Sequence, residues 1–401
     1  MTKKTYDVLV VGGGLAGTSA AYALAKRSLR VLLVDCREDL ATQASGNRFG
    51  LIMPYITDRY SPFERLYAAG FTFTHHALTK VFAEHTLFRD TGGVQLPATD
   101  RLAKLLDSSA PLIAPTQVTR LSRQDASDAI GVPSTQGCFH VPGGGYVQPA
   151  AFARALCIDN VSIQLSTKVH SIRQQGDAWN CELSDGSLIA APSIVVCAAY
   201  RAHGFPLLAD LPLEPVHGQT IAIPSSRTSS RLQTLICFDG YVTPAEHGSH
   251  LMGAHYQHFD LRQIPSDDDS QAIVSRAQHW FPSLQFADAS APSARVCFRT
   301  STFDRLPYIG EALDTTAMLR EANTFRSGTD LVSKVGAIPL PGVFVSIGHG
   351  SRGLLSCPLG GEIIARLVTK EPVGSFAEVA QITAPQRVTG RLLSTAPAQR
   401  G

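Results

Sequence analysis

The chain lacks the long hydrophobic runs that membrane-spanning proteins need. None of its apolar segments reaches the roughly 18 residues of a transmembrane helix, so we expect no membrane partner. The first predicted strand begins near residue 6, and this leaves no room for a signal peptide ahead of it. Both absences predict a cytoplasmic protein.

Metal-binding patterns are also missing. The chain has eight cysteines, and no two of them form a C-x-x-C pair. Scattered cysteines are typical of a protein in a reducing cytoplasm, and they argue against a zinc site. His255, His258 and Asp260 have a spacing that resembles a metal site, but no further ligand accompanies them. We therefore predict that no metal is bound.

A large excess of charge of either sign is absent as well. Lysine and arginine number 35 against 33 aspartate and glutamate, which gives a net charge of +2. Bulk charge therefore neither predicts nor excludes a nucleic-acid partner. The length of 401 residues is enough for two domains and a large core.

What the chain does contain is a dinucleotide-binding signature at its N-terminus. Residues 8–11 are an apolar run typical of a buried parallel strand. Gly12, Gly14 and Gly17 follow in G-x-G-x-x-G spacing, in which they permit a tight turn, a close approach of the backbone to a pyrophosphate, and close helix packing. A helix is expected from about residue 15 to residue 27, with its N-terminal N–H groups aimed at the phosphates.

The segment after this helix completes the signature. A second apolar strand, residues 31–34, ends at Asp35, where a carboxylate accepts hydrogen bonds from the ribose hydroxyls of an adenine dinucleotide. Leu15 and Ala16 begin the expected helix and belong to the same site. The alternative is a glycine-rich turn without a ligand, but that interpretation leaves Asp35 unexplained.

Only one full fingerprint is present, whereas an enzyme that passes hydride from NAD(P)H to a flavin usually has two, so the chain is expected to bind either NAD or FAD. Three features favour FAD, and the first is the position of the fingerprint at the N-terminus. A small-residue loop at 44–50 follows the second strand, and a second glycine-rich junction lies at 348–353. A helix N-terminus near residue 350 would stabilise the negative charge of a reduced flavin.

The remaining pattern predicts an α/β fold, α+β overall, with a Rossmann-like dinucleotide domain and a second domain built on an antiparallel sheet. Residues 194–197 are apolar throughout and are expected to return to the parallel sheet. Short strands separated by turns between 211 and 310 predict the antiparallel layer. We expect an FAD-binding domain at 1–75, 140–210 and 335–401, and a substrate domain at 76–139 and 211–334.

Longer motifs carry a resemblance to a known family. They include Ala44-Ser-Gly-Asn-Arg48, Asp239-Gly-Tyr-Val-Thr-Pro244, Gly253-Ala-His-Tyr256 and Gly350-Ser-Arg-Gly-Leu354. Over essentially its whole length the chain resembles the D-amino-acid oxidase-like FAD superfamily. It most closely resembles the FAD-dependent C-terminal domain of the bifunctional enzymes that make 5-methylaminomethyl-2-thiouridine in tRNA. Those enzymes carry a methyltransferase domain first, so the resemblance implies the oxidative step alone, with methylation by a separate protein.

The resemblance implies a reaction and a set of catalytic residues. The reaction is oxidation of a carboxymethylaminomethyl group on the wobble uridine of tRNA, which yields glyoxylate and an aminomethyl uridine. Arg299 matches the carboxylate-binding position of the superfamily, and a planar guanidinium suits a carboxylate. Tyr241 and Arg352 are further candidates for the same carboxylate. For each of the three, a structural role is the alternative.

The resemblance also implies how FAD is held. A non-covalent FAD is expected, with Cys357 as the alternative point of covalent attachment. Cys197-Ala-Ala-Tyr200 departs from the glycine-containing turn that is common after the third parallel strand. The cofactor-binding residues carried over are Gly12, Gly14, Leu15, Ala16, Gly17, Asp35, Ala44, Ser45, Val169, His349, Gly350, Arg352, Gly353 and Leu354.

Two other functions stay open at this point. One is an oxidase of a free small amino acid or amine, such as glycine, sarcosine or a D-amino acid. The other is a flavin-containing scaffold without turnover. A basic rim facing RNA would separate the first function from the tRNA reaction, and the chain offers Arg120, Arg123, Arg227 and Arg231 for it.

Overall fold

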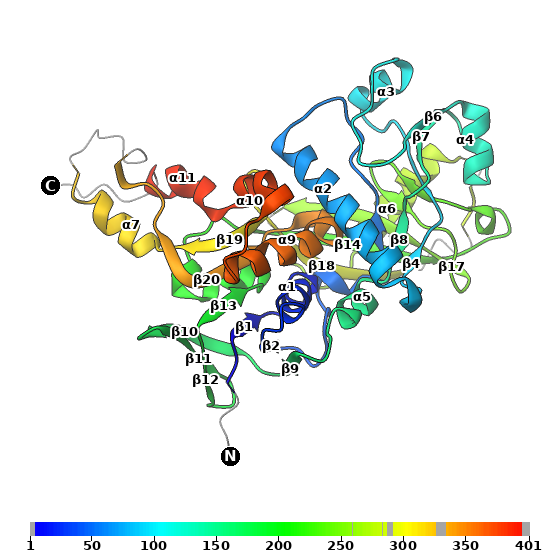
Figure 1. The fold of residues 1–401 in the computed structure, drawn as a ribbon. Helices are drawn as coiled ribbons and strands as arrows, with labels where there is room; N and C mark the ends of the chain where they lie inside the picture. Colours follow the sequence, from blue (N-terminus) through cyan, green and yellow to red (C-terminus); the bar gives the residue numbers. More distant parts are fainter. Residues whose placement is uncertain (1–4, 259, 283, 287–291, 326–333, 395–401) are drawn as a thin grey trace. The chain divides into compact units, whose positions relative to one another are not determined.

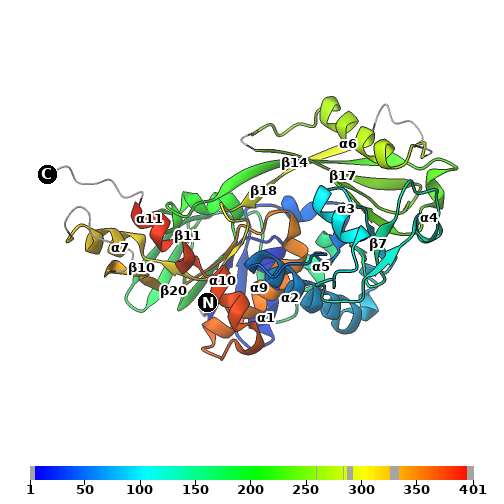
Figure 2. The ribbon, with the colours of Figure 1, turned by 90° about the horizontal axis from the view of Figure 1, so that it is seen from above.

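The computed structural model describes residues 5–258, 260–282, 284–286, 292–325 and 334–394 (Figures 1 and 2). The chain divides into two compact units. Unit 1 contains residues 1–42, 153–214 and 300–401, and unit 2 contains residues 43–152 and 215–299. Each unit has its own sheets and its own buried apolar clusters. The predicted fold class is confirmed.

Unit 1 is built on a six-stranded sheet. Its strand order is β19-β20-β13-β1-β2-β9, in which the last five strands are parallel and β19 is antiparallel. The strands are β1 (Val8–Val11), β2 (Val31–Val34), β9 (Val161–Gln164), β13 (Ser193–Val196), β19 (Tyr308–Leu313) and β20 (Pro339–Ile347). The central strands are buried along their length, as their unbroken apolar sequences predict.

Two helices that are far apart in sequence lie side by side in unit 1 (Figures 1 and 2). They are α1 (Leu15–Ala25) and α9 (Gly353–Val368). A Cβ at Gly361 would lie 2.5 Å from the carbonyl of Ser19, so only glycine allows this approach of the two backbones. The pair brings the two glycine-rich junctions of the chain into one unit.

The remaining elements of unit 1 flank this sheet. A small antiparallel sheet contains β10 (Val169–Gln175), β11 (Ala178–Leu183) and β12 (Leu188–Ala191). The other helices are α7 (Thr315–Ala322), α10 (Ala377–Thr383) and α11 (Thr389–Ser394). Helix α5 (Pro149–Ala155) crosses the boundary between the two units.

Unit 2 is built on an eight-stranded sheet in the order β18-β14-β17-β16-β15-β5-β7-β6. The strands are β5 (Gly93–Gln95), β6 (Thr119–Leu121), β7 (Cys138–Val141), β14 (Glu214–Pro224), β15 (Leu235–Cys237), β16 (Tyr241–Val242), β17 (Ser249–His258) and β18 (Ser293–Ser301). The predicted antiparallel pairing holds for β14 to β17, whereas β15 and β5 are parallel.

A three-stranded sheet and four helices complete unit 2. The sheet contains β3 (Gly50–Ile52), β8 (Gly145–Val147) and β4 (Phe88–Arg89). The helices are α2 (Pro62–His76), α3 (Asp100–Asp107), α4 (Arg123–Ile130) and α6 (Asp267–Trp280). Among the described residues, no helix is both long and apolar enough to cross a membrane.

The observed division differs from the expected domain boundaries. Residues 43–75 and 140–152 were expected with the fingerprint, but they cluster in unit 2. Residues 211–214 and 300–325 cluster in unit 1 instead of the expected substrate domain. The reason for the first difference is strand pairing, since β8 pairs with β3 and β4 in one sheet.

Candidate FAD site and active site

The fingerprint glycines form a turn that leaves no space for side chains. Gly12 has a φ of +115°, and a Cβ there would lie 2.6 Å from the carbonyl oxygen of Cys197. A Cβ at Gly17 would lie only 1.8 Å from the carbonyl oxygen of Gly12. Gly14 is the residue before α1, whose first turn begins with Leu15 and Ala16. A helix that begins directly after such a turn has its N-terminus directed at the position of a bound pyrophosphate.

Asp35 lies against this turn at the end of β2. Its carboxylate accepts a hydrogen bond from the N–H of Gly13, and another at 2.8 Å from the N–H of Arg37. The N–H of Thr167 donates to the Asp35 carbonyl at 2.9 Å, and Val169 begins β10 two residues later. A half-buried carboxylate beside a glycine-rich turn is the donor and acceptor set that a dinucleotide ribose needs. These residues fit FAD.

The second glycine-rich junction lies at the same edge of the sheet. β20, β13 and β1 are adjacent and parallel, so their carboxyl ends meet at one edge. Gly348 and Gly350 follow β20 with φ values of +80° and +57°. The short 3-10 turn Gly350–Arg352 then leads into α9, whose first residues are Gly353 and Leu354. The predicted pairing of the two junctions is confirmed for unit 1.

His349 is held in this junction by two serine hydroxyls. Its Nδ1 lies 2.9 Å from the Ser356 hydroxyl, and its Nε2 lies 3.1 Å from the Ser346 hydroxyl. Burial lowers the pKa of His349 to about 4. The imidazole is therefore neutral at physiological pH, and its two nitrogens serve to shape the junction.

The departure from the family pattern after β13 has a visible consequence. Ala199 has a φ of +53°, in the left-handed region that glycine adopts most easily.

Cys357, the alternative attachment point for FAD, is buried in α9, and burial raises the pKa of its thiol. A buried thiol with a raised pKa is a poor nucleophile.

In unit 2, the loop with Ala44 and Ser45 is anchored by the Arg295 side chain, which contacts the residues on either side of it. Ala44 and Ser45 lie in the 3-10 turn Ala44–Gly46. The Arg295 guanidinium donates to the Asn47 side-chain oxygen and to the Gln43 carbonyl, both at 2.7 Å. The loop is thus fixed to β18, the strand that also contains Arg299.

Two glycines in the large sheet make room for two tyrosine rings. Gly253 of β17 pairs with Tyr241 of β16, and a Cβ on Gly253 would lie 2.8 Å from the Tyr241 hydroxyl. Gly218 of β14 pairs with Tyr256 of β17, and a Cβ on Gly218 would lie 3.2 Å from the Tyr256 ring. The glycines therefore form a flat floor on which both rings lie.

Arg299 extends over the same floor. Its Nη1 would lie 3.0 Å from a Cβ on Gly218, and its guanidinium lies 4.3 Å from the centre of the Tyr256 ring. Tyr256 lies close enough to Tyr241 and Arg299 to affect the pKa values of these two groups. Burial raises the pKa of Tyr241, so its hydroxyl keeps its proton and is able to donate a hydrogen bond.

The charge of Arg299 has no counter-ion within the described structure. The residue is 9% exposed, and its Nη1 has no hydrogen-bond partner among the residues that are described. A buried cation without a partner is costly, so such a group is normally paired when its ligand is bound. The matching ligand is an anion, and a carboxylate fits the guanidinium best.

The family assignment agrees with this geometry. A family model described as "FAD dependent oxidoreductase" matches residues 7–367. The chain belongs to this family. FAD is therefore its cofactor, and the turn at Gly12, the carboxylate of Asp35 and the junction before α9 are the residues of unit 1 that fit it.

Two curated relatives of this FAD-dependent oxidoreductase share the same name. The chain is 32% identical to the tRNA 5-methylaminomethyl-2-thiouridine biosynthesis bifunctional protein MnmC of Aeromonas hydrophila, over 96% of this chain and 59% of the relative. It is 31% identical to the protein of the same name from Methylobacillus flagellatus, over 98% of this chain and 61% of the relative. The chain thus spans about three fifths of the relatives' length.

Solved structures show that the same fold is used by other oxidoreductases. Glycine oxidase from Geobacillus kaustophilus has a TM-score of 0.71 and 21% identity, over 94% of this chain and 98% of that one. Iminodiacetate oxidase from Chelativorans sp. BNC1 has a TM-score of 0.68 and 22% identity, over 92% and 96%. At this identity the likeness establishes the fold alone.

Three functional candidates in this FAD-dependent oxidoreductase were missed at the level of sequence. Tyr256 ends the motif Gly253-Ala-His-Tyr256, but its contact with Arg299 depends on the pairing of β17 with β14. Gly218 matters only because of the side chains that lie over it. For Arg295 one indication was available, because it stands four positions before Arg299, and residues four apart on a strand share a face.

The three predicted catalytic residues are divided between the units. Arg352 belongs to unit 1, whereas Arg299 and Tyr241 belong to unit 2.

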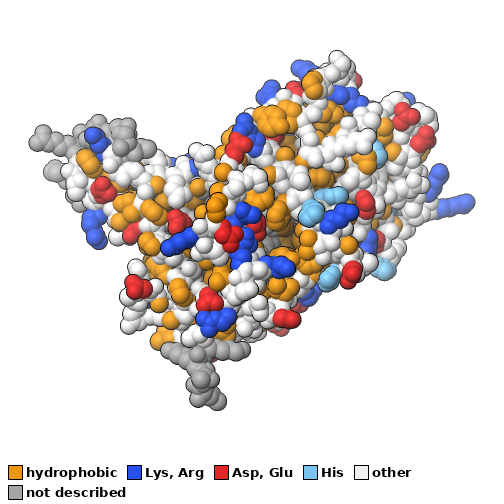
Figure 3. All heavy atoms as spheres, in the orientation of Figure 1, with side chains coloured by type: hydrophobic (Ala, Val, Ile, Leu, Met, Phe, Trp, Pro, Cys, Tyr) orange, Lys and Arg blue, Asp and Glu red, His pale blue; other side chains and the backbone are white. Residues whose placement is uncertain are grey.

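The expected basic rim is only partly available. Arg120 donates to the carbonyls of Leu105 and Ala110 and lies over the Phe139 ring, so it has a structural role. Arg227 and Arg231 are exposed. Lysine and arginine are interspersed with acidic side chains on the face shown in Figure 3, which agrees with the small net charge.

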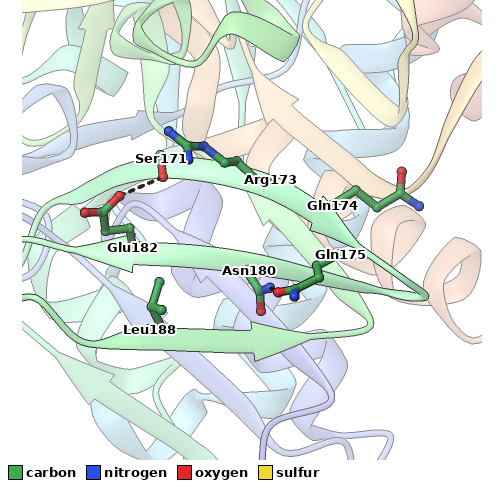
Figure 4. Close-up of a pocket in the computed structure, with 7 residues that line it drawn as sticks. All are labelled: Ser171, Arg173, Gln174, Gln175, Asn180, Glu182 and Leu188. Carbon is green, nitrogen blue, oxygen red and sulfur yellow. Dashed lines mark hydrogen bonds between the residues drawn. The ribbon is translucent and has the colours of Figure 1, made fainter.

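The structure also has a concavity away from the predicted site residues. A shallow concavity of about 300 Å³ lies on the small sheet of β10 to β12 (Figure 4). Most of the residues that line it are polar, with a hydrogen bond of 3.1 Å between Ser171 and Glu182, and none of them is a predicted site residue. Within the described ranges, no group of three or more histidine, cysteine or acidic side chains is placed to hold a metal.

Proposed function

We propose that this FAD-dependent oxidoreductase removes the carboxymethyl group from 5-carboxymethylaminomethyl-(2-thio)uridine at the wobble position of tRNA. The products are 5-aminomethyl-(2-thio)uridine and glyoxylate. The observation that carries the proposal is the buried Arg299 guanidinium, whose Nη1 lacks a partner in the described structure. A substrate with a carboxylate next to a secondary amine supplies that partner, and the names of the relatives point to this tRNA base.

The chemistry needs a donor with a hydrogen-bearing carbon between nitrogen and carboxylate. Bound FAD supplies the electron sink, because it accepts a hydride from that methylene. Loss of the hydride leaves a protonated imine on the substrate. Water then cleaves the carbon–nitrogen double bond and releases the aminomethyl uridine and glyoxylate. The donor is thus a CH–NH group.

The residues of the chain mainly bind and orient this donor. Arg299 binds the carboxylate through two parallel hydrogen bonds, which fixes the direction of the adjacent methylene. Tyr241 donates a hydrogen bond from its hydroxyl to the same carboxylate. Arg352, at the start of α9, is proposed as a further contact to substrate or cofactor. Unit 1 is proposed as the FAD-binding part and the large sheet of unit 2 as the substrate-binding part.

We further propose that the reaction takes place in the cytoplasm, with tRNA as the partner. All eight cysteines are free thiols in the structure, as a reducing compartment requires. We propose that a methyltransferase acts on the product, because the relatives' name refers to a methylaminomethyl base, which carries one methyl group more than the proposed aminomethyl product.

The second candidate is an oxidase of a free amino acid or amine. It is favoured by the same observation, because Arg299 and Tyr241 recognise the amino-carboxylate end and would accept glycine or sarcosine equally. The fold is shared with a glycine oxidase and an iminodiacetate oxidase. A flavin-containing scaffold without turnover is the third candidate.

Anaerobic flavin bleaching separates the three functions. The purified yellow protein is mixed with tRNA that carries 5-carboxymethylaminomethyl uridine and, separately, with glycine, sarcosine and D-alanine. We expect fast bleaching by the tRNA together with release of glyoxylate. Bleaching only by a free amino acid would contradict the tRNA function and support the second candidate. No bleaching by any of them would support the scaffold.

A further inference from the structure

We propose that Tyr256 is a stacking platform for the pyrimidine base of the substrate, so that the site of unit 2 has a base subsite beside its carboxylate subsite. This inference deepens the proposed function and rests on it, because a free amino acid has no base to stack. It adds recognition of a nucleoside to a site that otherwise recognises only an amino-carboxylate.

The first observation is the unequal covering of the Tyr256 ring. The Arg299 guanidinium lies over one face of the ring, 4.3 Å from its centre. The side chain of Tyr256 is nevertheless one of the exposed large side chains, with 42% of its surface accessible. Arg299 itself is only 9% exposed. The Tyr256 ring therefore contacts the buried guanidinium, while a large part of the residue stays accessible to a ligand.

The second observation is the fixed position of the ring. Tyr256 pairs with Gly218, and a Cβ on Gly218 would lie within 3.2 and 3.3 Å of two atoms of the ring. Gly218 would meet Nη1 of Arg299 at 3.0 Å in the same way. The absence of a side chain at Gly218 allows both the ring and the guanidinium to approach the backbone of β14 closely. A ring held this way is preorganised for a planar ligand.

The proposed substrate is short, so its base lies close to the residue that binds its carboxylate. Its carboxylate carbon is separated from C5 of the uracil by four single bonds of about 1.5 Å each, which span roughly 5 Å when extended. When the carboxylate is bound to Arg299, C5 of the base therefore lies within roughly 5 Å of the carboxylate carbon. Tyr256, in direct contact with Arg299, is a ring within that reach. Stacking on an aromatic side chain is the usual way in which proteins bind an unpaired base.

The competing interpretation is that Tyr256 only orients Arg299. Both interpretations predict weaker substrate binding when the ring is removed, so affinity for a single ligand does not separate them. They differ in the ratio of two affinities. A base platform affects a ligand that has a base, whereas an orienting residue affects every carboxylate ligand equally.

The test uses the FAD-loaded full chain and two probes that are not oxidised. The first is 5-(carboxymethylthiomethyl)uridine, in which sulfur replaces the amine nitrogen, and the second is (methylthio)acetate, which has the same carboxylate end without a base. Calorimetry gives the dissociation constant of each probe. For the unmodified chain we expect the uridine probe to bind at least tenfold more tightly, since stacking on a base has effects of this size.

Three variants then test the residue. Tyr256→Leu is expected to reduce the preference for the uridine probe about tenfold, even if both probes bind more weakly, and Tyr256→Phe is expected to retain it. Tyr60→Leu is the matched control, because Tyr60 is a 66% exposed tyrosine with its own arginine contact, 5.4 Å from Arg65. The unfolding temperature and flavin spectrum of each variant establish that it is folded.

Each outcome decides between the interpretations. A preference that is unchanged in Tyr256→Leu would overturn the base subsite, and so would equal binding of the two probes by the unmodified chain. A lost preference in Tyr256→Leu that Tyr256→Phe restores supports it. Bleaching of the unmodified chain by tRNA tests the proposed function separately, since that result does not depend on Tyr256.

Discussion

Arg299 is the residue on which the proposed substrate recognition depends most directly. We predict that Arg299→Lys raises the substrate concentration for half-maximal anaerobic flavin reduction by about ten- to a hundredfold. The reason is that lysine keeps the charge but cannot form two parallel hydrogen bonds with a carboxylate, and one such bond to a charged group contributes roughly 1.5–3 kcal/mol. The rate of bleaching is measured against substrate concentration.

The exposed Arg231 supplies the control for this prediction, since Arg231→Lys changes the same side-chain type outside the site. Flavin content is measured for both variants, because loss of FAD would also slow bleaching. An unchanged concentration dependence in Arg299→Lys would show that the carboxylate binds elsewhere.

His349 predicts a specific pH dependence of stability. Its pKa is lowered to about 4 by burial in the folded chain, against roughly 6.5 when unfolded. Between these values the unfolded chain binds a proton that the folded chain does not, so the stability falls as the pH falls from 6.5 to 4. We expect this one group to account for a loss of about 2 kcal/mol.

The measurement for His349 is urea unfolding at pH 7 and at pH 4.5. His349→Gln removes the titrating group, and other buried histidines such as His250 titrate in both proteins. The pH dependence is therefore expected to be shallower in the variant. The same slope in both proteins would mean that His349 is protonated without cost in the folded state.

At the scale of elements, the contact between α1 and α9 sets the arrangement of unit 1. A Cβ on Gly361 would lie 2.5 Å from backbone atoms of Ser19 and 2.8 Å from the backbone nitrogen of Ala20. Backbone atoms in a packed helix have little freedom to move, so we predict that Gly361→Ala destabilises the protein by about 3 kcal/mol or more and lowers FAD content. Thermal unfolding and flavin absorbance measure both effects.

The neighbouring glycine is a matched control for Gly361. A Cβ on Gly360 would meet the Ile309 side chain at 3.0 Å, and a side-chain end is able to rotate away. Gly360→Ala is therefore expected to cost about 1 kcal/mol or less. Equal effects of the two substitutions would show that the helices separate easily at this contact.

Patterns that are local in sequence were predictable, and those that depend on pairing were not. The apolar runs of β1, β2 and β13 and the glycine spacing predicted the parallel sheet with its turn, and the structure has both. Helix boundaries are harder to predict from local pattern. Helix α2 ends at His76 and is followed by short π and 3-10 segments, and α9 begins at Gly353 and continues through Pro358, a residue type that usually interrupts a helix.

The active-site floor lies beyond local pattern for a physical reason. Nothing in the sequence relates Gly218 to Tyr256, which are 38 positions apart, because their contact is created by the register of β14 on β17. The sequence identified Arg299 and Tyr241 through a resemblance. Their common environment became visible only when four neighbouring strands were in place.

At the scale of the whole molecule, each unit contains one of the two tryptophans. Trp179 of unit 1 is 5% exposed, and its indole N–H donates to the Pro341 carbonyl at 3.0 Å. Trp280 of unit 2 donates to the Asp239 carboxylate at 3.0 Å. The variants Trp280→Phe and Trp179→Phe thus leave one fluorescent reporter each, the first for unit 1 and the second for unit 2.

We predict that FAD stabilises unit 1 more than unit 2, because the fingerprint, Asp35 and the junction before α9 all lie in unit 1. A ligand at a hundred times its dissociation constant adds about 2.7 kcal/mol to the state that binds it. In urea unfolding of the apoprotein and the FAD-loaded protein, the Trp179 transition is therefore expected to shift further than the Trp280 transition. Equal shifts would contradict the prediction and would mean that the two units unfold as one cooperative body.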